Sequence, residues 1–158
     1  MTKVATAADV FRTGKLPHTE AEWLALGGVN EFYQEVAGLS IQCAVFQPAR
    51  ETKPSSGTVF VGGVPRDPAV RAKLPIVNKL FGYAAAGVAM DAKRPSYGFS
   101  FNWPGQGRSA GDILSTTIDS RTLFLTDLIH SLQKTYALDE VNLVGMNMGI
   151  VRLWPWNS

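Results

Sequence analysis

Cysteine, histidine and charge are all scarce in this 158-residue chain, and each scarcity excludes a class of site. Cys43 is the only cysteine, which excludes an intramolecular disulfide and favours a reducing compartment. Because its neighbours are largely apolar, we expect Cys43 to be a buried structural thiol. The two histidines, His18 and His130, are far apart and show no metal-ligand spacing with the cysteine. We therefore expect neither a metal site nor a cofactor.

Net charge and long apolar runs are lacking too. Fifteen basic and thirteen acidic residues leave a formal charge of +2, too small to indicate nucleic acid or an anionic membrane surface as a partner. The longest run of small apolar residues, 83–90, is far shorter than the roughly 20 residues that span a bilayer. Residues 1–15 lack the apolar stretch of a secretory signal, and residues 156–158 form no peroxisomal tripeptide. We expect a cytoplasmic protein.

The residues that are present are typical of a globular domain: 46% are hydrophobic and 18% are charged. Residues 1–29 are interpreted as an N-terminal extension with one short helix over 19–26. Thr19 is its expected N-cap, and Glu22 would complete a capping box. Residues 30–158 are interpreted as the partial α/β domain described next.

Strands and helices are expected to alternate through that domain. Apolar patterning predicts strands at 31–36, 39–46, 58–61, 97–103 and 141–144, with helices at 75–88 and 117–136. The short apolar strands 58–61 and 141–144 are expected to be covered on both faces. Thr116 and Asp119 are expected to cap the second helix. This order predicts a parallel sheet flanked by helices, with a leading antiparallel hairpin that turns at Gly38 and adds strands at one edge.

Three short motifs follow three of these strands directly. They are GGVP at 62–65, NWPGQGRS at 102–109 and GMNMG at 145–149. Each falls at the carboxyl end of an expected parallel strand, which is where open α/β sheets bind their ligands.

The order of these motifs resembles the α/β-hydrolase superfamily over roughly residues 30–152. That family has His-Gly-x-Pro, then Asp-x-x-Gly-x-Gly-x-Ser, then Gly-x-Ser-x-Gly at the nucleophile elbow. This sequence departs from the pattern at Gly62, Asn102 and Asn147, which replace His, Asp and the nucleophilic Ser. The resemblance implies an incomplete α/β-hydrolase sheet: an N-terminal antiparallel hairpin plus parallel strands flanked by helices, truncated after the elbow.

The resemblance also implies a set of site residues. Gly145 and Gly149 would leave room for the sharp turn from strand to helix, and Asn147 would occupy the nucleophile position. The backbone N–H groups of Val64 and Met148 would be the two oxyanion-hole donors. The ligand implied is a small ester or acyl compound.

Hydrolysis is nevertheless not expected from this sequence. The nitrogen lone pair of the Asn147 amide is delocalised into its carbonyl, so the amide is a poor nucleophile. The family places its acid and histidine after the elbow, and residues 150–158 contain no Asp, Glu or His. The activity of the parent family would be hydrolysis of an ester, a thioester or a related acyl compound, through a serine, or of an epoxide, through an aspartate. Asn147 leaves open whether the ancestral nucleophile was Ser or Asp, and the sequence leaves open whether the truncation is real.

Alternative interpretations remain. A narrower resemblance links residues 102–109 and the long N-terminal lead to fungal hydrolases of secondary metabolism and toxin biosynthesis, some of which are peroxisomal. A second interpretation is a non-catalytic small-molecule-binding or regulatory protein on a degenerate hydrolase fold. A dinucleotide-binding domain, suggested by glycines at 105, 107 and 111, is disfavoured because no helix is expected to begin between these glycines and residue 117. Strand 141–144 is expected to form an exposed sheet edge, with instability or self-association as the result.

Overall fold

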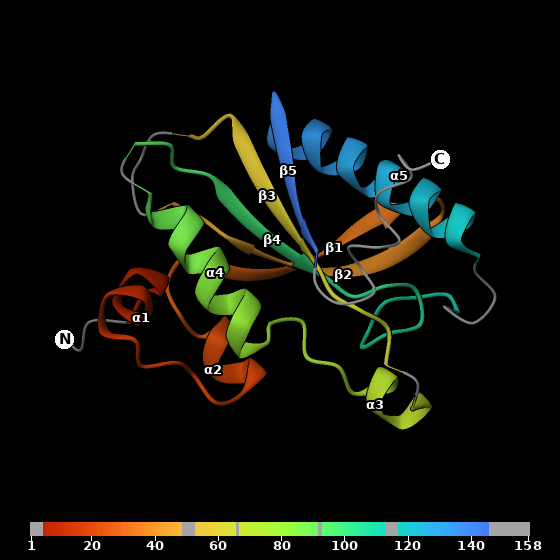
Figure 1. Ribbon diagram of the computed structural model, residues 1–158, viewed down its shortest axis with the longest axis horizontal. Coiled ribbons are helices and arrows are strands. Elements are labelled where there is room, and N and C mark those ends of the chain that lie inside the picture. The colour runs from red at the N-terminus through yellow and green to blue at the C-terminus, as the bar shows by residue number, and fades with distance from the viewer. Residues whose placement is uncertain (1–4, 49–52, 66, 92, 113–116, 146–158) are drawn as a thin grey trace.

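The computed structural model describes residues 5–48, 53–65, 67–91, 93–112 and 117–145. The strands are β1 (Val29–Val36), β2 (Leu39–Phe46), β3 (Ser56–Val61), β4 (Tyr97–Phe101) and β5 (Glu140–Gly145). The helices are α1 (Ala7–Thr13), α2 (Glu20–Leu24), α3 (Pro68–Ala72), α4 (Lys79–Met90) and α5 (Ile118–Tyr136). The strands form one sheet in the order β1-β2-β4-β3-β5 (Figure 1).

The sheet is mixed, as the sequence predicts. β1 and β2 form an antiparallel hairpin in which Val36 pairs with Leu39 across a two-residue turn. Both turn residues have positive φ, 51° at Ala37 and 80° at Gly38, as a type I′ turn requires, which confirms the turn expected at Gly38. β2 runs antiparallel to β4, and β3 runs parallel to both β4 and β5. The hairpin therefore extends one side of a three-stranded parallel sheet.

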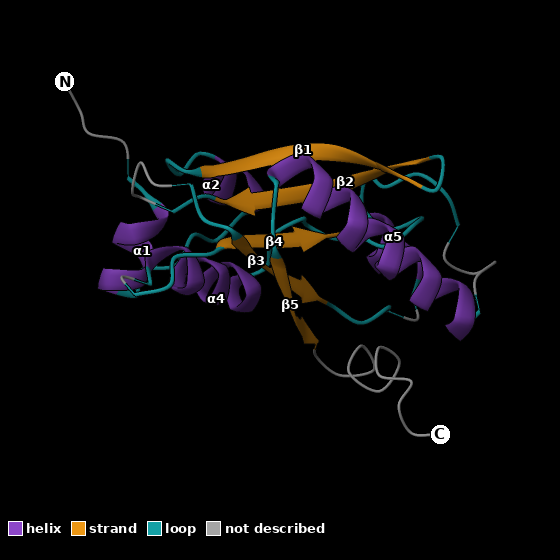
Figure 2. Ribbon diagram, turned by 90° about the horizontal axis from the view of Figure 1, so that it is seen from above, coloured by secondary structure: helices purple, strands orange, loops and turns teal. Residues whose placement is uncertain are grey.

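Helices cover both faces of this sheet (Figure 2). α5 covers one face with the buried side chains Phe124, Leu125, Leu128 and Leu132, which pack with alternate strand residues such as Val45 and Val59. The opposite face carries the intervening strand residues, such as Phe46 and Phe60, against α4, α1 and α2. The alternation of side chains along each strand thus builds two cores, one on each side of the sheet.

Capping residues set where the two long helices begin. α4 begins at Lys79, later than expected, because the Asn78 side chain accepts a hydrogen bond from the Phe81 N–H at 2.8 Å. The expected cap of α5 was wrong: Thr117 caps the helix and forms a capping box with Ser120. The threonine before it, at position 116, lies outside the described residues.

The N-terminal segment contains one helix more than the sequence analysis predicted. α1, capped by Thr6, was missed, whereas Thr19 caps α2 as expected. Glu22 does not close a capping box on Thr19; its carboxylate accepts from the His18 N–H at 3.2 Å. Trp23 is 1% exposed and belongs to the core formed with α4. The described part of this segment is therefore packed onto the sheet domain.

β5 differs from its prediction as a strand covered on both faces. Its residues alternate between exposed and partly buried, and Val144 is 41% exposed. Within the described chain, β5 pairs only with β3, so it forms an edge of the sheet as the sequence predicts. None of the helices in the described ranges is long and apolar enough to cross a membrane.

Candidate functional site

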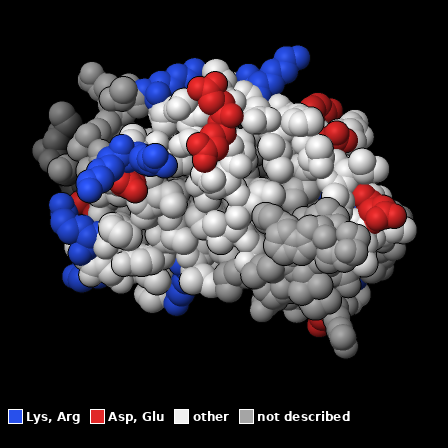
Figure 3. All heavy atoms as spheres, turned by 45° about the horizontal axis from the view of Figure 1, so that its top comes forward, with Lys and Arg blue, Asp and Glu red and all other residues white. Residues whose placement is uncertain are grey.

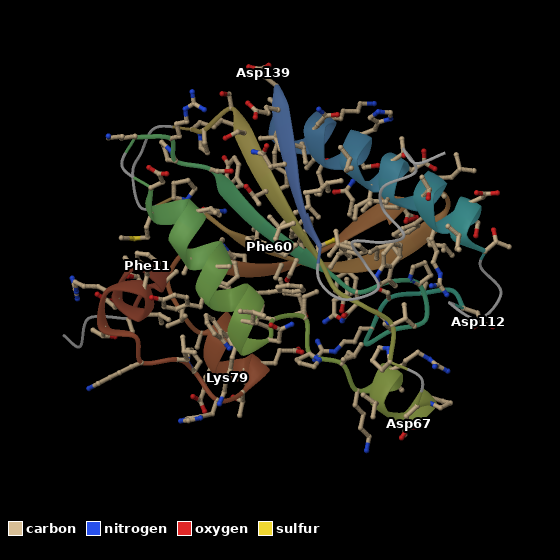
Figure 4. All side chains as sticks on the ribbon, viewed as in Figure 1. Phe11, Phe60, Asp67, Lys79, Asp112 and Asp139 are labelled. Carbon is tan, nitrogen blue, oxygen red and sulfur yellow. The ribbon has the colours of Figure 1, made fainter. Side chains whose placement is uncertain are left out.

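A cavity of about 340 Å³ lies at the carboxyl ends of β3 and β4. Its wall combines the loop after β3, the loop after β4 and the start of α4, and includes Gly62, Gly63, Leu80, Phe81, Trp103 and Gln106. Figure 4 shows the two ends of the sheet: Asp139 lies just before β5, and Asp67, at the start of α3, lies beyond the opposite end. The cavity is at this opposite end, where the sequence motifs predicted a ligand site.

The loop after β3 is held by side chains from other segments. Trp103 Nε1 donates to the Gly62 carbonyl at 3.0 Å, and the buried Arg71 donates from its guanidinium to the Pro65 carbonyl at 2.8 Å. Gly63 lines the cavity, while the Val64 side chain packs against the core beneath α5. Position 64 therefore lies beside the cavity wall, and the oxyanion role of its N–H stays a prediction.

The loop after β4 is anchored to β2 through Gln42. The Gln42 Oε1 atom accepts from Asn102 Nδ2 at 2.8 Å and from the Arg108 N–H at 2.9 Å. Gln42 N–H donates to Ser109 Oγ at 2.9 Å, and that hydroxyl donates to the Asn102 carbonyl at 2.6 Å. Residues 102–109 are thus fixed by buried hydrogen bonds. The side chains of Asn102 and Ser109 hold the loop in place, so their polar groups are already engaged within the protein.

An ion-pair cluster closes the outer side of this loop. The Arg108 guanidinium contacts the carboxylates of Glu31 and Glu20, each at 3.2 Å. The pKa of Arg108 is raised by a hydrogen bond with Tyr33 and by these two carboxylates. Because Arg108 is exposed, solvent screens the pairs, and their main effect is to orient the loop.

Gln106 carries a buried polar group with no partner. Its Oε1 accepts from the Trp103 N–H at 3.2 Å, and its side chain is 2% exposed. The Nε2 atom has no hydrogen-bond partner, and it is the only such buried side-chain atom within the described ranges. Such an atom is costly in a folded protein unless a ligand or water satisfies it.

The other sequence-predicted residues divide into two groups. Gly145 ends β5 and is the register partner of Val61, so β5 ends beside the strand that leads into the cavity loop. Asn147, Met148 and Gly149 lie outside the described residues. The structure therefore brings the first two motifs together at one cavity and places the start of the third next to them.

Cys43 and the histidines stay apart from the cavity. Cys43 is buried, as predicted, and burial raises the pKa of its thiol to about 12. His18 and His130 are both exposed. In the ranges that the structure describes, no three His, Cys, Asp or Glu side chains gather as a metal ion would require. On the face seen in Figure 3, charged side chains of both signs lie along the top and the sides of an uncharged area.

Sequence reasoning missed Gln106, Gln42 and Arg71. Gln106 occupies a variable position of the loop motif, so its type carried no signal by itself. Gln42 acts on residues 60 and 66 positions away, which no local spacing could indicate. A signal existed only in its position, as a polar residue inside the otherwise apolar run 41–46 of β2.

Comparison with known proteins places this architecture. No family model matches the sequence, and no curated protein matches it. Among solved structures, XC6422 of Xanthomonas campestris, an α/β serine hydrolase without a lid, aligns with a TM-score of 0.59 and 13% identity over 80% of this chain and 54% of its own. The haloalkane dehalogenase DatA from Agrobacterium tumefaciens C58 gives 0.52 and 16% identity, with 84% and 36% covered. The Pyrococcus furiosus esterase PF2001 gives 0.52 and 12%, with 79% and 42% covered.

At such identities the likeness concerns the fold alone. The chain has the α/β-hydrolase fold, and it spans about one third to one half of the length of these proteins. The expected fold class, an incomplete α/β-hydrolase sheet with a leading hairpin, is confirmed.

Proposed function

We propose that this α/β-hydrolase-like protein binds a small ester or acyl compound in the cavity at the ends of β3 and β4, without cleaving it. The observation that carries the proposal is the position of the cavity, bounded by the loops after two parallel strands of this fold. Ligands of α/β sheets bind at that end.

The size and lining of the cavity support a small, largely apolar ligand. About 340 Å³ lies at the lower end of the range typical of small-molecule sites. Phe81 and Trp103 supply aromatic surface, and none of the described lining residues carries a charged side chain. An uncharged ester is therefore favoured over an ionised acid, which would lose its hydration without gaining a counter-ion.

The chemistry of residue 147 argues against hydrolysis. An amide at the nucleophile position offers no hydroxyl to deprotonate and no basic nitrogen. The only two histidines of the sequence, His18 and His130, are exposed and neither belongs to the described wall of the cavity. A serine introduced at position 147 would therefore find no histidine among the described lining residues to act as its general base.

Ligand-dependent stabilisation tests the binding proposal. Butyl acetate and butyl benzoate are expected to raise the melting temperature, because a ligand that binds only the folded state stabilises it by mass action. Leu80 lines the cavity and is 55% exposed, so Leu80→Arg should block it at little cost in stability. Leu123→Arg, at a 66% exposed position of α5, is the matched control and should keep the shift. No shift with any ester, or an equal loss in both variants, would contradict the proposal.

Turnover tests the second half of the proposal. The wild-type chain and Asn147→Ser should both release p-nitrophenol from p-nitrophenyl butyrate no faster than an equal concentration of the Leu80→Arg variant. Release by the wild type that Leu80→Arg abolishes would show hydrolysis at this cavity and overturn the proposed lack of cleavage.

We further propose that the ligand is an acyl or polyketide-like compound of secondary metabolism, such as toxin biosynthesis, and that the protein is cytoplasmic. Support comes from the NWPGQGRS wording at 102–109, which resembles fungal hydrolases of that kind. Branched or aromatic acyl esters should then stabilise the protein more than linear short-chain esters, and a fluorescent fusion should distribute through the cytosol. Equal responses to both ester classes, or a peroxisomal pattern, would contradict these two points.

A further inference from the structure

Gln106 stands out among the polar side chains that line the cavity. Ser100 Oγ donates to the Ile76 carbonyl at 2.6 Å, and Asn102 Nδ2 donates to Gln42 Oε1. The Asn78 side-chain oxygen is occupied as the cap of α4. Within the described lining, Gln106 alone has a buried side-chain donor that no hydrogen bond uses.

The orientation of the Gln106 amide follows from its neighbour. Its Oε1 accepts from the Trp103 N–H, and a half-turn of the amide would set two donors against each other. The NH₂ group is therefore the end directed away from Trp103. Trp103 is itself fixed, because its indole nitrogen donates to the Gly62 carbonyl. The donor is thus held in place by both loops of the cavity.

We propose that Gln106 Nε2 is the specificity-determining donor of this cavity and binds the carbonyl oxygen of an uncharged ester, ketone or amide. This inference rests on the proposed function. A neutral acceptor fits because the described lining supplies one buried side-chain donor without a partner and no charged side chain to balance an ionised ligand. The aromatic and aliphatic remainder of the wall takes the apolar body of the same molecule.

Two probes that differ in one group test the assignment. 4-Phenyl-2-butanone and butylbenzene have the same carbon skeleton, and only the ketone carries an acceptor; neither can be hydrolysed. Their affinities are measured by titration of the intrinsic tryptophan fluorescence, to which Trp103 in the cavity wall contributes. Gln106→Leu should weaken the ketone about tenfold, a typical loss for one hydrogen bond, and leave butylbenzene unchanged or tighter.

Two further variants separate the donor from the rest of the wall. Gln106→Glu, measured at mildly alkaline pH, keeps an oxygen for the Trp103 N–H but replaces the donor by a second oxygen. It should therefore weaken the ketone selectively as well. Leu80→Ala removes apolar lining only, and it should weaken both probes by a similar factor.

The outcomes distinguish this inference from the proposed function. If the wild-type protein binds neither probe, the proposed binding function fails and the role of Gln106 fails with it. If both probes bind and Gln106→Leu changes their affinities equally, the cavity is a ligand site and the donor role of Gln106 is wrong.

Discussion

Asn102 Nδ2 donates to Gln42 Oε1 across 2.8 Å, and this bond requires an amide at position 102. Gln42 must present its oxygen there, because its Nε2 donates at 2.8 Å to the carboxylate of Glu31, which can only accept. The same Asn102 nitrogen also donates to the Leu74 carbonyl at 3.3 Å. The asparagine at position 102, where the motif that the sequence resembles has aspartate, is therefore explained by its two acceptor neighbours.

Asn102→Asp is expected to lower the free energy of unfolding by about 3 kcal/mol at neutral pH, because the buried carboxylate would face two oxygens. The surroundings would raise the pKa of the new carboxyl in the folded state above its unfolded value of about 4. The variant is therefore most stable below about pH 4, where the new carboxyl is protonated in both the folded and the unfolded state, and it loses stability as the pH rises. Urea titrations at several pH values measure this, and a constant deficit from acid to neutral pH would contradict it.

A second substitution provides a rescue. Glu31→Gln replaces an acceptor-only group with an amide, so the Gln42 side chain is free to rotate and turn its NH₂ toward the carboxylate introduced by Asn102→Asp. We expect Glu31→Gln with Asn102→Asp to be about 1 kcal/mol more stable than Asn102→Asp alone. The Arg108 N–H, which also needs the Gln42 oxygen, limits the rescue. Strict additivity of the two substitutions would show that Gln42 does not couple them.

Gly107 lies against the hydrogen-bonded side chains of Asn102 and Gln42. It has a φ of +51°, and a Cβ there would lie 2.8 Å from Gln42 Oε1 and 2.9 Å from the Leu74 carbonyl. Gly14 has a φ of +71° but no atom within 4 Å of an added Cβ, so it isolates the backbone strain. Gly14→Ala should cost about 1 kcal/mol and Gly107→Ala about 3 kcal/mol in denaturant unfolding. Equal costs would mean that the hydrogen-bonded groups around Gly107 can move aside for the extra methyl group without loss of stability.

The elements that were predicted correctly are those whose patterns follow burial. α5 repeats apolar residues at helical spacing, and Leu125, Leu128 and Leu132 are all buried as that spacing requires. α1 was missed because its seven residues bury only Ala7 and Val10, too few to produce a periodic signal. The exposure of β5 was also not predictable, since coverage of a strand depends on which helix packs over it, and α5 packs mainly against β1.

The cavity lies beside motifs that the sequence analysis named, but the residues that supply its polar groups were not predicted. The glycine-rich motifs placed a ligand site at the strand ends, because the turns that follow parallel strands depend on local sequence. Gln106 Nε2 is notable because it has no hydrogen-bond partner, which only the folded structure shows. The loop geometry depends on Gln42, which lies more than 60 positions away in the sequence. Such long-range partners follow from the fold and not from spacing.

Two glycines of α4 are expected to respond in opposite ways to alanine. A Cβ at Gly82 would lie 2.5 Å from the ring of Trp23, which is fully buried and cannot move aside. A Cβ at Gly87 would meet only the rim of Phe11, at 3.0 Å, and Phe11 is 39% exposed. Gly87→Ala should stabilise by up to about 1 kcal/mol through helix propensity, whereas Gly82→Ala should destabilise by about 2 kcal/mol. Thermal unfolding measures both, and a stabilising Gly82→Ala would show that the N-terminal segment packs less tightly than described.

The buried thiol predicts an alkaline loss of stability. Burial raises the pKa of Cys43 to about 12 in the folded protein, from about 9 when it is exposed. The unfolded chain therefore loses this proton first, and stability should fall by roughly 1.4 kcal/mol per pH unit as the pH rises from about 9 toward 12. Tyr136, whose pKa burial raises to about 12, adds to the upper part of this range. Cys43→Ala should shift the whole curve but flatten its slope just above pH 9, and an unchanged slope would exclude the thiol as its source.

The open edge of β5 is the basis of our proposal that the protein associates with itself. In the described chain, β5 pairs with β3 alone, and an unpaired strand edge offers N–H and C=O groups to a second copy. Sedimentation velocity should show association that increases with concentration. Val144→Lys, at a 41% exposed position of β5, should reduce it, since charges on an edge strand oppose pairing. Leu123→Lys removes a more exposed apolar side chain from α5, outside the strand that carries the free edge, so it should leave association unchanged. If Leu123→Lys is the variant that prevents self-association, the copies associate through an apolar contact of α5 and not through pairing of strands.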